Sequence, residues 1–167
     1  ERKLAKRGAD VIVVDGAPTA EELEAKLQQV LAAGPVQGVY WLPAADLEPE
    51  LGELDPDTWR EALRVRVKLL YRAMRALYEA VSARGTFLVS ATRLGGVHGY
   101  GESGATAPLG GAVVGFTKEF ARERADALVK AVDFEAKRKV NEVADLLLEE
   151  TLRDPVAVEI GRRGDER

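Results

Sequence analysis

The sequence predicts one α/β domain with a doubly wound parallel sheet, and three observations indicate it. Short apolar runs alternate with longer amphipathic segments along the chain, as in folds whose helices cover both faces of a parallel sheet. The chain has 167 residues, about the length of one domain, and 46% of them are hydrophobic. No linker, internal repeat or low-complexity segment divides it. We therefore expect a single domain over residues 1–167.

Five apolar runs indicate strands. The first, residues 11–14, reads Val-Ile-Val-Val and ends at Asp15-Gly16. Such a continuous apolar run is typical of a strand that is buried on both faces of a parallel sheet. The expected strands are residues 11–14, 38–42, 86–90, 127–134 and 156–160.

Four amphipathic segments indicate helices between these strands. Thr19 is followed three residues later by Glu22, the pattern of a capping box. Asp55-Pro56 starts the longest predicted helix, whose apolar residues recur at helical spacing to about Ser82. The expected helices are residues 19–33, 55–82, 108–124 and 137–152.

The composition excludes several classes of function. The 24 Lys and Arg residues against 28 Asp and Glu residues give a net charge of −4, whereas dedicated nucleic-acid-binding domains are usually basic. Without cysteine and with a single histidine, His98, the chain offers no disulfide and no thiolate or multi-histidine metal site. No apolar run approaches the roughly 20 residues that span a bilayer, and no signal peptide opens the chain. These features predict a cytoplasmic protein with neither a membrane nor a nucleic-acid partner.

The start of the chain argues against a complete nucleotide-binding fold. Such folds place a Gly-rich turn after their first strand, where backbone amides approach a pyrophosphate. Only the ten residues 1–10 precede the first expected strand, too few for another strand, such a turn and a helix. The run 11–14 then corresponds to the second strand, and the fold to a truncated Rossmann-like sheet of about five strands. Asp15 falls at the place of the ribose-binding acidic residue, but without a phosphate loop a turn-forming Asp is the favoured interpretation.

Four segments of the chain match, in order, the sequence pattern of one protein family. Residues 36–44 stand where that family has a strand that ends in His-Ala-Ala-Gly. Residues 59–70 match the long helix that follows this strand. Residues 87–99 match a strand and Gly-rich loop with a catalytic serine, and residues 104–117 match a helix with a catalytic tyrosine. Residues 38–134 thus resemble a short-chain dehydrogenase/reductase, and more narrowly the ketoreductase region of a modular polyketide synthase or multifunctional fatty-acid synthase.

The resemblance leaves one of three catalytic roles in place. In that family a Tyr protonates the carbonyl oxygen, a Ser holds it, and a Lys lowers the Tyr pKa. Ser90 matches the serine, but Thr106 stands at the tyrosine position and Gly110 at the Lys or Asn position four residues on. Arg66 aligns best with the lysine that polyketide ketoreductases carry on the preceding helix. Because an arginine stays protonated, it could not tune the tyrosine pKa by losing a proton, as the lysine can. Tyr100, in the Gly-rich loop, is the alternative proton donor.

The resemblance implies the non-catalytic first half of a ketoreductase, excised from a larger chain. This half would support a catalytic half in the same polypeptide, which binds NADPH and reduces a β-ketoacyl group, possibly delivered by an acyl carrier protein. No cofactor and no catalytic residue is then expected in this chain. The alternatives are a divergent NAD(P)-dependent oxidoreductase that uses Ser90 and Tyr100, and a module that binds an acyl ligand at the strand ends.

Two groups of residues are candidates for contact with partners. The first comprises aromatic, apolar and histidine side chains near the expected carboxyl ends of the strands, with core packing as the alternative for Trp41 and an unreactive surface position for His98. Its members are Tyr40, Trp41, Leu94, His98 and Tyr100. The second is a basic stripe on the long helix, which would face solvent or an acidic carrier protein. Its members are Arg60, Arg64, Arg66, Lys68, Arg72 and Arg75.

Overall fold

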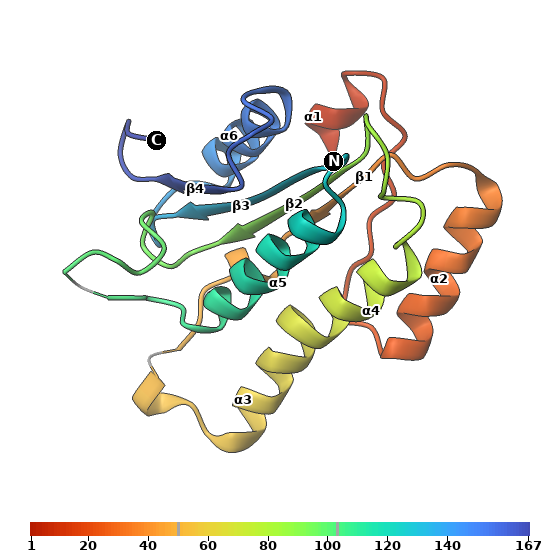
Figure 1. The fold of residues 1–167 in the computed structure, drawn as a ribbon. Helices are drawn as coiled ribbons and strands as arrows, with labels where there is room; N and C mark the ends of the chain where they lie inside the picture. Colours follow the sequence, from red (N-terminus) through yellow and green to blue (C-terminus); the bar gives the residue numbers. More distant parts are fainter. Residues whose placement is uncertain (50, 103) are drawn as a thin grey trace.

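The computed structural model describes residues 1–49, 51–102 and 104–167. Four parallel strands form one sheet in the order β1-β2-β3-β4 (Figure 1). The strands are β1 (Gly38–Trp41), β2 (Phe87–Thr92), β3 (Leu128–Phe134) and β4 (Glu159–Arg162). The parallel α/β architecture predicted from the sequence is therefore confirmed.

Helices cover both faces of this sheet. Helices α2 to α5 lie on one face, and α6 lies on the other (Figure 1). The α-helices are α1 (Arg2–Ala5), α2 (Ala20–Ala33), α3 (Pro56–Leu63), α4 (Leu69–Ala76), α5 (Leu109–Glu123) and α6 (Val140–Leu152). Two 3₁₀ turns, η1 (Pro43–Ala45) and η2 (Leu51–Glu53), follow β1. Within the described residues, no helix has the length and apolar character needed to cross a bilayer.

The two helix caps predicted from local sequence, at Thr19 and Asp55, are confirmed, whereas the helix expected from residue 137 begins at Val140. Thr19 Oγ1 accepts a hydrogen bond from the Glu22 amide at 3.2 Å, and Glu22 Oε2 accepts one from the Thr19 amide at 2.8 Å. The Asp55 carboxylate caps α3 by accepting from the amides of Asp57 and Thr58. Both caps satisfy amides that the first helical turn leaves without a partner.

The long helix differs from the expected single segment. A π-helical turn, η3 (Arg64–Lys68), separates α3 from α4, and α4 ends at Ala76. The indole Nε1 of Trp41 donates a hydrogen bond to the Arg66 carbonyl oxygen at 2.9 Å. Insertion of a side-chain donor into the carbonyl ladder is a known cause of such irregular turns. Trp41 therefore ties the end of β1 to this turn.

The strand expected at residues 11–14 does not form, and that expectation is wrong. The segment is irregular, and Ile12, Val13 and Val14 are 53%, 49% and 42% exposed. A strand requires a neighbour for its backbone hydrogen bonds. In the described sheet β1 is an edge strand that pairs only with β2, and the segment 11–14 joins no ladder. The described sheet therefore has four strands instead of about five.

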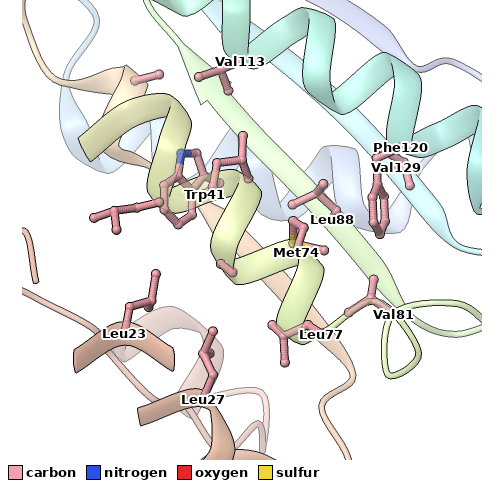
Figure 2. Packing of buried hydrophobic residues seen from close by; sticks show 14 residues of the cluster. Leu23, Leu27, Trp41, Met74, Leu77, Val81, Leu88, Val113, Phe120 and Val129 are labelled. Carbon is pink, nitrogen blue, oxygen red and sulfur yellow. The ribbon is translucent and has the colours of Figure 1, made fainter. Parts of the chain in front are cut away.

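Two buried clusters hold the helices to the sheet. The larger cluster packs α2, α4 and α5 against one face and includes Trp41, Leu88 and Phe120 (Figure 2). The second cluster packs α6 against the other face through Val89 and Val132, among others. Leu88 and Val89 are neighbours on β2 and belong to different clusters, as expected for a strand that is covered on both faces.

The Gly-rich loop and β4 approach each other closely at two glycines. A Cβ atom at Gly161 would fall against the Gly96 carbonyl oxygen. We expect Gly161→Ala to lower the free energy of unfolding by about 1–3 kcal/mol, because the two backbones must separate. The control Gly111→Ala, where nothing lies within 4 Å of the added atom, should be neutral or slightly stabilising. Urea unfolding measures both, and equal effects of the two substitutions would contradict the close-approach argument.

Candidate functional site

Arg93 lies across the carboxyl ends of the strands. It follows β2, is 7% exposed, and donates hydrogen bonds to four carbonyl oxygens. One acceptor, Ala45 at 2.6 Å, belongs to the turn after β1. The others, Glu135 at 2.9 Å, Ala136 at 2.7 Å and Arg138 at 3.1 Å, follow β3. The guanidinium thus spans the edge where doubly wound folds usually bind their ligands.

Asp133 fixes the start of the Gly-rich loop. Its carboxylate, near the end of β3, has no exposed surface. It accepts hydrogen bonds from Thr92 Oγ1 at 2.8 Å and from the amides of Leu94 at 2.6 Å and His98 at 2.9 Å. Asp133 therefore organises the backbone of the loop, and its accepting capacity is used inside the protein.

Ser90 is enclosed between β2 and α5. Its side chain has no exposed surface, and its hydroxyl lies 2.8 Å from Thr117 Oγ1 and 3.4 Å from the Lys130 carbonyl oxygen. Thr117 in turn donates to the Val113 carbonyl within α5. These hydrogen bonds join the helix to the sheet, and they leave the Ser90 hydroxyl facing protein on all sides.

Tyr100 is not brought together with Ser90. The Tyr100 side chain is 86% exposed on the Gly-rich loop, whereas Ser90 is fully buried. Lys118 on α5 is bound to the Glu159 carboxylate. That hydrogen bond raises the pKa of Lys118, so this lysine stays protonated. A Ser–Tyr pair that polarises one carbonyl group requires both hydroxyls at the same point, and these two do not meet.

The residues at the expected tyrosine and lysine positions have structural contacts instead. The Thr106 hydroxyl donates to the Arg93 carbonyl oxygen at 2.6 Å. Gly110 is buried in the first turn of α5, where an added Cβ would lie 3.2 Å from Thr92 Cβ and 3.2 Å from Leu94 Cγ. Glycine at this position therefore lets α5 pack closely on the end of β2.

Arg66 forms a buried ion pair. Its Nε lies 3.1 Å from Glu48 Oε1, and the Glu48 side chain is 1% exposed. Burial raises the pKa of Glu48, while the nearby Arg66 charge opposes that rise. Arg66 therefore anchors the segment after β1 to the π-helical turn. Asp15, by contrast, is exposed beside Gly16 and belongs to the irregular segment outside the sheet.

Most of the residues expected to contact partners are buried, so the expectation that they form an exposed contact surface is wrong. Trp41 is 9% and Leu94 3% exposed, and Tyr40 donates to or accepts from Thr151 Oγ1 at 2.7 Å on the α6 face. The His98 side chain is 8% exposed and lies 3.7 Å from Glu159, so its expected surface position is wrong. Of these candidates only Tyr100 is exposed.

The basic stripe is largely neutralised within the chain. Four of its six members form ion pairs with acidic side chains of the same chain, which leaves little free positive charge for an acidic partner. The pairs are Arg60–Asp57, Arg64–Glu61, Arg66–Glu48 and Arg72–Glu24.

The chain has the short-chain dehydrogenase/reductase fold. Its structure matches a metagenomic short-chain oxidoreductase in complex with NADP at a TM-score of 0.63 and 18% identity, over 98% of this chain and 80% of that one. It matches an alcohol dehydrogenase from the archaeon Thermococcus sibiricus, complexed with 5-hydroxy-NADP, at 0.70 and 14%, over 99% and 80% of the chains. A 3-oxoacyl-[acyl-carrier protein] reductase with bound NAD from Brucella melitensis matches at 0.68 and 20%, over 99% and 75%. No family model and no curated protein matches the sequence.

The described residues do not bring the expected ribose-binding position to the sheet. The usual cradle is a Gly-rich turn between the first strand and its helix. By the correspondence of strands given above, β1 is a later strand of that fold, so the turn η1 after it is not the position of this cradle. Asp15, the residue expected at the ribose position, lies outside the sheet. The described part of the chain also gathers no group of three acidic or histidine side chains that could hold a metal ion.

Arg93 and Asp133 were not among the site residues predicted from the sequence. Both stand at the ends of apolar runs, Val-Ser-Ala-Thr-Arg and Ala-Val-Asp-Phe. A charged residue that directly follows or interrupts a buried strand is costly unless it is paired. That position was the available signal, and it points to internal hydrogen bonding.

Proposed function

We propose that this chain is the non-catalytic, structural half of a two-part ketoreductase of the polyketide or multifunctional fatty-acid synthase type. It docks on and supports an NADPH-dependent reductase half in the same polypeptide. The reductase half reduces a β-ketoacyl group carried by an acyl carrier protein. The fold supports the class of the parent module, and the similarity to a 3-oxoacyl-[acyl-carrier protein] reductase is consistent with that substrate.

The observation that carries the proposal is the closure of the strand ends by Arg93. A reductase of this fold must admit a cofactor and a carbonyl substrate beside the carboxyl ends of its strands. In this chain a single guanidinium bonds four carbonyl groups there. Opening the space for a ligand would leave these groups without partners, which is costly.

The lost catalytic positions support the same proposal. Thr106 has an aliphatic hydroxyl that is too weak an acid to protonate a carbonyl oxygen, and it already donates to Arg93. Gly110 has no side chain, and Arg66 is committed to Glu48. The burial of Ser90 and the exposure of Tyr100 do not favour the alternative, a divergent oxidoreductase that uses these two residues.

The test combines NADPH binding with turnover of a β-ketoacyl thioester by this chain alone. We expect neither NADPH fluorescence enhancement nor NADPH oxidation. A second arm adds the separately purified reductase half, whose thermal midpoint should rise when this chain is present. NADPH binding near micromolar affinity, with turnover that Tyr100→Phe abolishes, would overturn the proposal in favour of a reductase. Tyr100 is exposed, so this variant is expected to fold.

A further inference from the structure

A pocket of about 570 Å³ opens between α3 and the segment that joins β1 to α3 (Figure 1). Its volume lies in the range of small-molecule sites, roughly 300–1,000 Å³. Apolar side chains from three parts of the chain form most of its lining, among them Leu54, Val65 and Leu109. Neither Arg93 nor any residue that accepts its hydrogen bonds lines this pocket. The pocket is therefore separate from the strand ends that Arg93 closes.

The Glu48 carboxylate lines this pocket and has unused hydrogen-bonding capacity. The Glu48 side chain is 1% exposed, and its Oε1 lies 3.1 Å from Arg66 Nε. That contact lacks hydrogen-bond geometry, and neither Glu48 oxygen accepts a hydrogen bond from the described part of the chain. An ionised carboxylate can accept about four hydrogen bonds, and a buried one without donors is costly. Glu48 is thus a buried acceptor that a ligand in the pocket can satisfy.

The other carboxylates of the pocket already have partners. Asp57 binds Arg60 at 2.7 Å, and Glu61 binds Arg64 at 2.7 Å. Both acidic side chains are exposed, so a cation that paired with them at the mouth of the pocket would gain little free energy. Glu48 is therefore the carboxylate of this pocket that can select a ligand by its charge.

We propose that the pocket binds a small apolar molecule that ends in an ammonium group. The ammonium group donates hydrogen bonds to the Glu48 carboxylate, and the apolar body lies against Leu54, Val65 and Leu109. An ammonium group is preferred to a neutral hydroxyl, because a hydrogen bond to an ionised partner is stronger when the donor is charged as well. A ligand that ends in a carboxylate is disfavoured, because it meets the like charge of Glu48. This inference is independent of the proposed function, since it uses no residue of the strand ends that Arg93 closes.

Three probes with the same apolar chain test the charge preference on the whole protein. Hexylamine, hexanol and hexanoate are each titrated into the labelled protein, and amide chemical shifts are followed by NMR. We expect hexylamine to bind about tenfold more tightly than hexanol or better, and hexanoate to bind most weakly. The shifted amides should lie within residues 54–66 and at Leu109. Absence of binding by hexylamine, equal affinities of hexylamine and hexanol, or a preference for hexanoate would each overturn the proposal.

Glu48→Gln tests the assigned acceptor, because it keeps the size of the side chain and removes its charge. We expect it to weaken hexylamine binding by about tenfold and to change hexanol binding by less than about threefold. Glu21→Gln on α2 removes an exposed carboxylate outside the pocket and serves as the matched control, with hexylamine binding unchanged. Unchanged hexylamine binding in Glu48→Gln would contradict the role of Glu48.

Ala62→Phe gives a second test that leaves the buried ion pair in place. Ala62 is a half-buried residue of α3 that lines the pocket, so a phenyl ring there can occupy the space of the ligand. We expect this variant to weaken hexylamine and hexanol binding alike by about tenfold or more. If both probes bind Ala62→Phe as they bind the unaltered chain, their site lies elsewhere and the proposal is wrong.

Discussion

Arg93→Ala is expected to lower the free energy of unfolding by about 3 kcal/mol or more, because each carbonyl group that loses its donor in a partly buried setting costs on the order of 1–3 kcal/mol. Four carbonyl oxygens depend on this guanidinium, one after β1 and three after β3. The loss therefore releases two loops at once. Hydrogen exchange should become faster in residues 43–46 and 135–139, and urea unfolding gives the loss of stability.

Two variants separate hydrogen bonding from charge. Arg93→Lys keeps the positive charge, but a compact ammonium group cannot reach carbonyls on both loops, so we expect it to recover only part of the stability. Arg84→Ala removes an arginine whose side chain is 92% exposed, and it should change the stability by less than about 0.5 kcal/mol. If Arg93→Ala behaved like Arg84→Ala, the proposed closure of the strand ends would lose its physical basis.

Features that depend on neighbouring residues in the sequence were predictable. The Thr19–Glu22 capping box and the Asp55 cap involve residues two or three positions apart, and both form as expected. The alternation of apolar runs and amphipathic segments likewise predicted the parallel sheet, because that pattern follows from covering both faces with helices.

Features that depend on distant partners were not predictable in the same way. Residues 11–14 have the composition of a strand, but a strand also needs an adjacent edge, and the described sheet brings none to them. Ser90 matches a catalytic position, yet its function is decided by α5, which places Thr117 against it. His98 lies in a segment rich in glycine, and only the approach of β4 buries it beside Glu159.

The charged residues buried between the sheet and α6 were likewise not predictable from the sequence. A substitution among them is expected to have the second large effect on stability. Lys130 on β3 and Glu150 on α6 have no exposed surface, and Lys130 Nζ lies 3.3 Å from Glu150 Oε2. Arg162 also binds the Glu150 carboxylate, and Arg167 contacts both of its oxygens, at 2.9 and 3.1 Å. One buried carboxylate therefore contacts three cations from β3, β4 and the segment after β4, and two of these cations also pair with Glu149 and Asp154.

Glu150→Gln is expected to cost about 3–5 kcal/mol of stability, because it leaves the buried Lys130 without its carboxylate partner and removes one partner of Arg162 and Arg167. The double variant Lys130→Met with Glu150→Leu removes the buried pair together and should cost less than Glu150→Gln alone. Urea unfolding compares the three proteins. A double variant that is less stable than Glu150→Gln would show that apolar replacement of the pair fails to compensate for its loss.

The same carboxylate should make the stability depend on pH in the acid range. Burial raises the pKa of Glu150, but Arg167 and Arg162 together lower it below its ordinary value. A carboxylate whose pKa is lower in the folded state stabilises the fold fully above its unfolded pKa of about 4.3, and it loses this contribution as the pH falls through the folded pKa. We therefore expect urea midpoints to fall below about pH 4 in the unaltered chain. Glu150→Gln should show a smaller fall over the same range, and equal slopes in the two proteins would place the acid sensitivity on other carboxylates.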